Sequence, residues 1–233
     1  MGHGPDPRLV TVIAVKQGAS PVDRTPRVAN AARGKARTEK KPRDERWDEL
    51  QRAAAEVFAK KGYKSTSLQE LADEIGILKG SLYYYIETKE DLLYELVRVI
   101  LDGGIGNLQR IASEEGDAIT RLKKVIEAHV QYLISNLAAT TVFLHDIKHL
   151  SKARRDMLAV DEYEMIIQRL IEDGQSEGTI RSDIDPKLIK MAVLGVVNWT
   201  YRWYRADIGL TPEHIGQQFA NLIVDGLSQE NLR

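Results

Sequence analysis

Lys79 to Tyr85, a stretch without an acidic side chain, carries the groups in this sequence best suited to a polyanion. Gly80 and Ser81 are small enough to let the backbone approach a groove closely, while Lys79 and the hydroxyl groups of Tyr83 and Tyr84 can donate hydrogen bonds to phosphate oxygens. A helix of this composition is suited to a DNA groove. The pattern therefore predicts a nucleic-acid-binding segment.

Two short helices are expected to position this stretch. Ser67 and Glu70 form a capping-box pattern that starts one helix, which a glycine ends, and the next helix is expected over about 79–85. The second helix is too short to be stable alone, so Leu82 and Ile86 are its expected inward anchors. Two helices joined by a tight turn predict a helix-turn-helix.

Longer helices are expected on both sides of this unit. The first starts near Trp47 and has one apolar face, formed by Leu50, Ala54, Val57 and Phe58. The other is capped by Thr88 and has Lys89 in its first turn, where backbone N–H groups and the helix dipole attract phosphate. Lys89 is therefore a further candidate for an anion contact.

The charge is unevenly distributed along the 233 residues. Residues 1–46 carry eleven Lys and Arg against five Asp and Glu, so a net charge of −1 for the whole chain leaves −7 for the remainder. Five of the seven prolines also fall within the first 44 residues. Residues 1–44 are therefore expected to be a basic, disordered arm, which suits a polyanion or serves as a solubilising tail.

Composition excludes several classes of protein. The chain has no cysteine, which excludes disulfides, thiolate metal sites and cysteine nucleophiles and fits a reducing cytoplasm. Charged residues are abundant and β-branched alternation is scarce, which favours an all-α fold. No apolar run approaches the roughly 20 residues that a membrane-spanning helix needs. We expect a cytoplasmic protein without a membrane partner.

Catalytic and metal-binding patterns are weak. His145 and His149 are four residues apart and could meet at one ion, but no third ligand is evident, so a solvated or inter-helix role competes with a metal site. Asp161, Glu162 and Glu164 read as a solvated face, because nothing supplies the apolar environment that shifts carboxyl pKa values in active sites. We expect no enzyme activity, no cofactor and no metal.

The C-terminal half predicts five more helices, beyond Gly103 and Gly104. Their ranges are about 116–135, 140–150, 152–177, 186–207 and 212–229, with Asp185 and Thr211 as caps of the last two. The run from Met191 to Trp199 is apolar nearly all the way round. Together with the apolar face of the last helix, it predicts a four-helix interface in a homodimer.

The order of these features resembles the TetR family of transcriptional regulators. The matching residues lie within about 47–97: Ala54, Val57, Phe58, Gly62, Tyr63, Thr66, Ser67, Leu68, Leu71, Gly76, Gly80, Ser81, Leu82, Tyr83, Tyr85 and the run Lys89 to Leu92. The resemblance implies an all-α homodimer with an N-terminal three-helix DNA-binding domain and a larger helical ligand-binding and dimerisation domain. It places these domains at 45–92 and 93–233.

The resemblance also implies roles for individual residues. Lys79, Gly80 and Ser81 would face the groove, and Tyr83 and Tyr84 would contact its edge and phosphates. Thr66, Ser67 and Lys89 would lie at the helix starts that meet the DNA backbone. Two positions depart from the family pattern: Leu78 stands where a Ser or Thr cap is common, and Ile86 where a Phe is usual.

A narrower resemblance concerns the small molecule. The segments Ile77 to Tyr83 and Trp199 to Arg205 look like the branch of the family that represses lipid and steroid catabolism and is released by acyl-CoA thioesters. Trp199, Arg202, Trp203 and Arg205 would then bind the ligand, because guanidinium pairs with phosphate and indole faces an adenine or acyl chain. The alternative is that the arginines form salt bridges and the aromatic side chains belong to the dimer core.

The sequence therefore predicts a ligand-responsive, DNA-binding repressor that leaves its double-stranded operator when a small molecule binds. Two alternatives stay open. One is a TetR-type repressor of a multidrug efflux or stress gene. The other is a helical small-molecule-binding protein whose helix-turn-helix is only structural.

Overall fold

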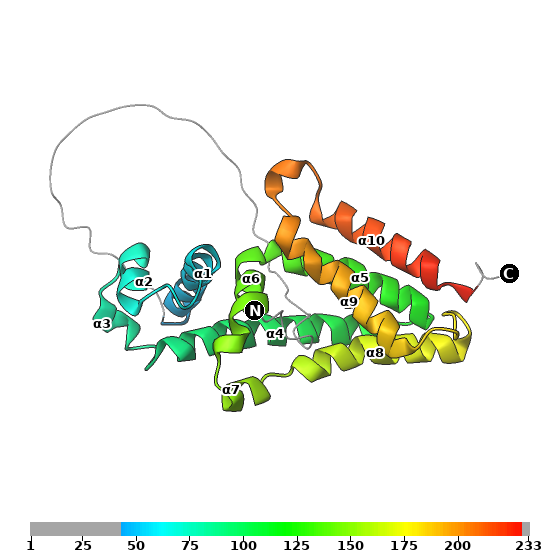
Figure 1. The fold of residues 1–233 in the computed structure, drawn as a ribbon, viewed down its shortest axis with the longest axis horizontal. Coiled ribbons are helices and arrows are strands. Elements are labelled where there is room, and N and C mark those ends of the chain that lie inside the picture. The colour runs from blue at the N-terminus through cyan, green and yellow to red at the C-terminus, as the bar shows by residue number, and fades with distance from the viewer. Residues whose placement is uncertain (1–42, 230–233) are drawn as a thin grey trace, which may run out of the picture.

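The computed structural model describes residues 43–229, which form helices and no β-strand (Figure 1). The α-helices are α1 (Arg43–Lys61), α2 (Leu68–Ile75), α3 (Lys79–Leu82), α4 (Lys89–Ala112), α5 (Ala118–Ser135), α6 (Leu137–Asp146), α7 (Lys152–Asp156), α8 (Val160–Glu177), α9 (Pro186–Trp203) and α10 (Pro212–Leu227), and two 3-10 helices are η1 (Ile147–His149) and η2 (Ala206–Ile208). The all-α prediction is confirmed. The expected arm falls outside the described residues as far as residue 42, and α1 begins at Arg43.

The first three helices form a small unit, which we call the head, at one end of the long helix α4 (Figure 1). The predicted capping box starts α2: the Ser67 hydroxyl accepts from the amide of Glu70, and the Glu70 carboxylate accepts from the amide of Ser67. Gly76 ends α2 with φ of +73°, a left-handed conformation that favours glycine. A second capping box, of Thr88 and Asp91, starts α4.

The helix α3 is shorter than predicted. It covers one turn, and residues 83–85 continue as turns instead of extending the helix as far as Tyr85. No side chain caps its start, because Leu78 has no hydrogen-bonding group. The expected anchors hold it in place: Leu82 is fully buried and Ile86 is nearly so. The ring of Tyr85 also stacks on Trp47 of α1, with 5.5 Å between the centroids.

Helix α4 continues through Gly103 and Gly104, the pair beyond which the sequence analysis places the next helices. A Cβ atom on Gly103 would lie 2.6 Å from the hydroxyl oxygen of Tyr132 in α5, and this hydroxyl donates to the carbonyl of Ile100 at 2.9 Å. The glycine therefore permits a close approach of α5 to α4. It marks helix packing here and does not mark a helix end.

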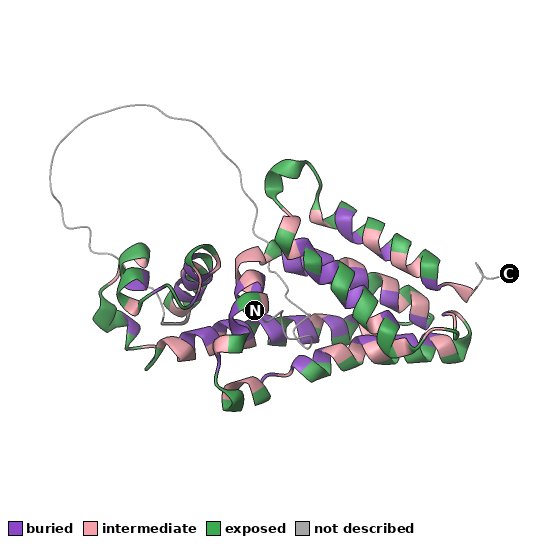
Figure 2. Cartoon of the chain, in the orientation of Figure 1, coloured by how far each residue is buried: buried purple, intermediate pink, exposed green. Residues whose placement is uncertain are grey.

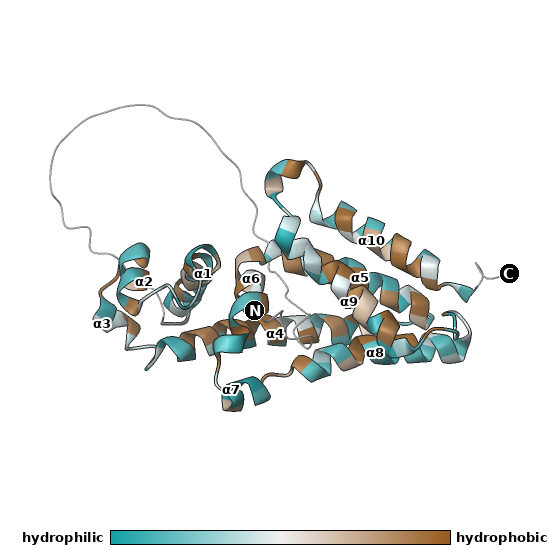
Figure 3. Cartoon of the chain, viewed as in Figure 1, coloured by the Kyte–Doolittle hydropathy of each residue, from teal (hydrophilic) through white to brown (hydrophobic). Residues whose placement is uncertain are grey.

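The helices α4 to α10 form a larger unit, which we call the body. Figure 2 shows buried positions gathered on α4 and α5, and Figure 3 shows hydrophobic bands on the same helices and on α10. Asp185 and Thr211 cap α9 and α10 as predicted. The prediction of a single helix over 152–177 is wrong, because residues 157–159 interrupt the helix where Leu158 turns inward. No helix within residues 43–229 is long and apolar enough to span a bilayer.

A buried polar group connects three helices of the body. His129 of α5 lies between the hydroxyl of Tyr163 of α8, 2.8 Å from Nδ1, and the amide oxygen of Asn198 of α9, 3.0 Å from Nε2. Burial lowers the pKa of His129 to about 4, an effect that the hydrogen bond from its Nε2 to the Asn198 oxygen opposes only in part. The imidazole is therefore neutral at pH 7.

This buried histidine predicts a loss of stability in acid. Between a pKa of about 6.5 in the unfolded chain and about 4 in the folded protein, only the unfolded state binds the proton, so stability falls as pH drops through that window. The loss should reach about 3 kcal/mol. Melting temperatures of the wild type and His129→Gln between pH 7.5 and 4.5 test this. The wild type should fall more steeply, and parallel curves would contradict the prediction.

Candidate DNA-binding and effector sites

The predicted groove-facing residues share the outer side of the head. Lys79, Gly80 and Ser81 are all exposed, as are Tyr83 (50 %) and Tyr84 (65 %). The Lys79 ammonium lies 6.0 Å from the ring centroid of Tyr83. Donor groups and aromatic rings thus stand together on one surface, while Leu82 points the opposite way into the core.

Gly80 has no role in the packing of the head. A Cβ atom at this position would meet no atom within 4 Å. The space left by the missing side chain opens outward, beside Lys79 and Ser81. A glycine that the fold does not need, on a surface of hydrogen-bond donors, is consistent with close approach by an external partner.

Thr66 and Ser67 are occupied inside the head. Thr66 is buried, and its hydroxyl donates to the carbonyl of Gly62 at 2.9 Å. The Ser67 hydroxyl accepts from Glu70 in the capping box, although Ser67 itself is exposed. Of the two, Ser67 stands at the surface, whereas the side chain of Thr66 braces the loop between α1 and α2.

Lys89 ties the start of α4 to the same loop. Its ammonium donates to the carbonyls of Tyr63 and Thr66, both at 2.7 Å, and lies 4.2 Å from the ring centroid of Tyr63. Burial lowers the pKa of Lys89, and the charges of Asp146 and Glu70 act in the opposite direction. The structure therefore gives Lys89 an internal role, which the sequence did not reveal because Tyr63 and Thr66 lie more than twenty residues away.

Tyr63 also meets the body. Its amide lies 3.4 Å from the carboxylate of Asp146, and its ring stacks on His149 at 5.8 Å between centroids. His145 turns elsewhere and lies 2.7 Å from the hydroxyl of Tyr201. The two histidines thus serve different contacts, and no group of three metal-ligating side chains occurs among residues 43–229.

The four predicted ligand residues lie near the end of α9. Trp199 is 60 % exposed, and Arg202 and Arg205 are exposed. Trp203 is partly buried against Phe219 of α10, with 6.3 Å between ring centroids. Trp199 belongs to an exposed apolar row on α9 that continues toward the start of the helix, and this position favours the alternative of a dimer core.

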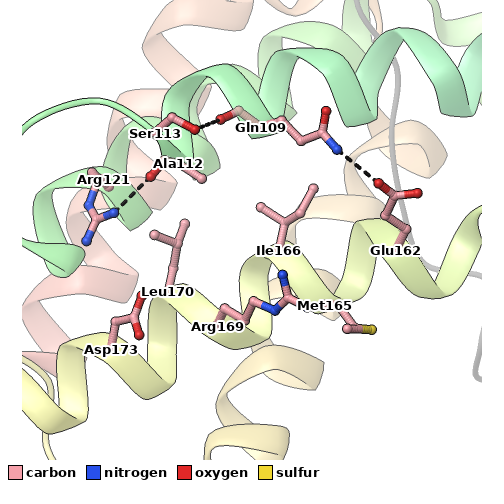
Figure 4. A pocket seen from close by; sticks show the side chains of 10 residues that line it. All are labelled: Gln109, Ala112, Ser113, Arg121, Glu162, Met165, Ile166, Arg169, Leu170 and Asp173. Carbon is pink, nitrogen blue, oxygen red and sulfur yellow. Dashed lines mark hydrogen bonds between the residues drawn. The ribbon is translucent and has the colours of Figure 1, made fainter.

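A groove of about 600 Å³ between α4, α5 and α8 was not foreseen from the sequence (Figure 4). Ile166 and Leu170 form part of its apolar floor, and Arg121 and Asp173 stand at one end. The Arg121 guanidinium donates to the carbonyl of Ala112 at 2.8 Å, and its buried Nε has no partner. Arg169 lines the same groove, so two guanidinium groups border an apolar surface.

Fold and exposed surface define a helix-turn-helix DNA-binding protein. Two family models match the chain: the one described as bacterial regulatory proteins, tetR family, covers residues 50–96, and the one described as tetracyclin repressor-like, C-terminal domain, covers residues 115–227. The chain belongs to the TetR family of transcriptional regulators.

Similar proteins agree with this assignment. The transcriptional repressor KstR2 of Rhodococcus jostii is 28 % identical over 183 residues, which cover 77 % of this chain and 90 % of that protein. The fatty acid metabolism regulator protein of Bacillus subtilis is 25 % identical over 178 residues, 75 % of this chain and 92 % of that protein.

Solved structures give the same result. The regulator PfmR of Thermus thermophilus is 31 % identical with a TM-score of 0.71, covering 77 % of this chain and 98 % of that one. The ketosteroid regulator KstR2 of Mycobacterium tuberculosis is 26 % identical with a TM-score of 0.74, covering 78 % and 95 %. The similarity thus spans the head and the body.

The two lysines of the head predict opposite outcomes. Lys89→Met leaves two carbonyls without their charged donor, which should cost about 1.5–3 kcal/mol and lower the melting temperature by roughly 3–12 °C. Lys79→Met removes an exposed charge and should leave the melting temperature almost unchanged. Thermal unfolding of both variants without DNA measures this. A stable Lys89→Met protein would show that the internal contacts of Lys89 are unimportant.

Proposed function

We propose that the protein is a cytoplasmic repressor that binds its operator as a homodimer and is released by a lipid-derived or steroid-derived acyl-CoA thioester. The exposed surface of α3 supports the DNA-binding part most directly, because it presents donors and aromatic rings over a buried anchor. Lys79, Gly80 and Ser81 face the major groove, where the Lys79 ammonium pairs with a phosphate at the groove edge, and Tyr83 and Tyr84 contact further phosphates. In a dimer, two such helices about 34–36 Å apart meet successive turns of DNA.

Gly80 and Lys79 offer the sharpest test of DNA binding. Gly80→Ala should stabilise the free protein by about 0.5–1 kcal/mol, since alanine favours a helix and meets no neighbour, but it should weaken binding by obstructing close approach. Lys79→Ala should reduce the slope of log affinity against log salt by about two, one phosphate contact per subunit. Gel shifts on a duplex selected from random sequences measure both effects.

The hydroxyl-deletion variants Tyr83→Phe and Tyr84→Phe complete the series, because they keep the ring and remove only the donor. Each should weaken binding to every duplex by a similar factor, as phosphate contacts do. If Gly80→Ala and Lys79→Ala both bind the selected duplex as tightly as the wild type, α3 is not the DNA-reading surface.

The dimer is proposed to form through α9 and α10. Four exposed apolar side chains form a row on α9: Leu188, Met191, Val196 and Trp199. Beside this row, Leu222 of α10 is 70 % exposed. A hollow of about 410 Å³ lies between the two helices. Gly195 and Gly226 have open space where a side chain would stand, so another pair of helices can approach closely.

Trp199→Asp decides between the dimer and the ligand role of this residue. A charge on the apolar row should dissociate the dimer in sedimentation experiments, because it would be buried without a partner. Arg202→Ala, one turn further along α9, is the matched control and should remain dimeric. A Trp199→Asp protein that stays dimeric would exclude this face as the interface.

The ligand proposal is supported by the relatives whose names refer to ketosteroids and fatty acids. A groove with an apolar floor and two arginines suits a molecule with both an acyl chain and phosphates. Arg202 and Arg205 stay a second predicted phosphate site, at the end of α9.

Oleoyl-CoA at micromolar concentration should raise the melting temperature and release the selected duplex. Arg169→Ala, in the groove, and Arg202→Ala, on α9, then locate the phosphate contacts, since only the variant at the true site loses the shift. If neither oleoyl-CoA nor a steroid acyl-CoA has an effect, the ligand proposal fails, whereas the DNA-binding proposal is unaffected.

A further inference from the structure

A groove of about 800 Å³ lies where the head meets the body, separate from the groove beside α8. One wall belongs to α1 of the head, and the others belong to α4 and to the junction of α5 with α6. Helix α6 packs against both α1 and α4, which lie beside it in Figure 1. A volume of this order is typical of small-molecule sites.

The start of α6 borders this groove and has no side-chain cap. Asn136 precedes the helix, but its side chain donates to the carbonyl of Tyr132 and makes no capping hydrogen bond. Ala138 and Ala139, in the first turn, line the groove. The amide groups of a first turn have no partner within their own helix, and together with the helix dipole they attract an anion.

Gln51 of α1 supplies an independent indication of a ligand. This residue lines the groove and is only 8 % exposed, and its side-chain amide nitrogen has no hydrogen-bond partner. A buried amide without a partner is unfavourable unless something accepts its hydrogen bond. Both the side-chain amide of Gln51 and the first-turn N–H groups of α6 thus lack a hydrogen-bond acceptor.

The remaining lining suits a hydrocarbon. Leu96, Val99 and Ile134 contribute apolar surface, and Val99 is 46 % exposed although it lies on a helix of the core. Three exposed charged side chains also border the groove on the α1 side: Asp48 and Glu56, which would favour an amine, and Arg52, which would favour a carboxylate. An amine is therefore the competing probe in the experiment below.

We propose that this groove binds a small amphipathic carboxylate as a second effector. The carboxylate accepts from the first-turn amides of α6 and from Gln51, while the hydrocarbon covers Leu96, Val99 and Ile134. Because the walls belong to both head and body, the bound molecule fixes their relative position. Its binding is then coupled to that of DNA, with the same factor in both directions.

Isothermal titration of the full chain with octanoate tests the proposal, with octylamine and octan-1-ol as probes of equal length. Octanoate should bind saturably and more tightly than either. Ala139→Asp and Ala139→Asn have nearly the same shape, but only the aspartate places a negative charge in the first turn of α6. Octanoate affinity of Ala139→Asp should be about ten-fold or more below that of Ala139→Asn.

Gln51→Met provides a second measurement, because methionine keeps the volume and removes the amide. The variant should bind octanoate less tightly and have a higher melting temperature than the wild type, since it no longer buries an unpaired donor. A purely structural glutamine would give a lower melting temperature instead.

Three results would overturn the proposal: no saturable binding of octanoate, equal affinity in the two Ala139 variants, or tighter binding of octylamine. None of these measurements uses DNA or acyl-CoA. Their failure would therefore leave the proposed repressor function untouched, and they can succeed even if the acyl-CoA proposal fails.

Discussion

A helix of four residues has no stability of its own in water, and α3 is such a helix. Its geometry therefore depends on the residues beneath it. Leu82 is fully buried, Ile86 follows it into the core, and Tyr85 stacks on Trp47 of the first helix. The outer residues can be chosen for contact with a partner because the inner ones already fix the backbone. This separation suits the role of a rigid reading surface that is proposed for α3.

The same dependence extends from the head to the body. The loop after α1 is held on one side by the Lys89 ammonium and on the other by His149 and Asp146, with the ring of Tyr63 between them. Within the body, Arg154 of α7 forms an ion pair with Asp91 at the start of α4. The polar contacts of Tyr63 and Lys89 supplement the apolar packing of α1 on α6, since the buried side chains of head and body form one continuous core. A movement of the head must therefore shift packed helices as well as exchange polar contacts.

Local patterns made the head predictable from the sequence. Capping boxes, a left-handed glycine and the spacing of apolar residues act within a few positions, so they identified α1, α2, α4 and the inward side of α3. The contact of Lys89 with Tyr63 and the break at Leu158 depend on distant packing, which no local pattern records. Gly103 shows the difference clearly. In sequence a glycine pair resembles a helix end, whereas in three dimensions it makes room for Tyr132.

The same difference between local patterns and distant contacts applies to the candidate sites. Exposure of Lys79, Gly80, Ser81, Tyr83 and Tyr84 follows from the helical period once Leu82 is placed inside. The internal role of Thr66 does not follow, because a buried and an exposed threonine look alike in a sequence. The groove beside α8 brings together residues from three helices, and the groove beneath α1 brings together residues from four. Their lining could be recognised only after these helices were placed in space.

The open positions at Gly195 and Gly226 have a consequence for partner choice. In the dimer proposed through α9 and α10, one such gap lies on each helix, so partner choice would depend on shape as well as on apolar contact. A second copy of this chain presents the same gaps, whereas a related regulator with larger side chains at either point would clash. Exclusion of near-relatives by shape costs the matched pair nothing. Under this proposal, two glycines would keep the subunits of one regulator from mixing with those of another.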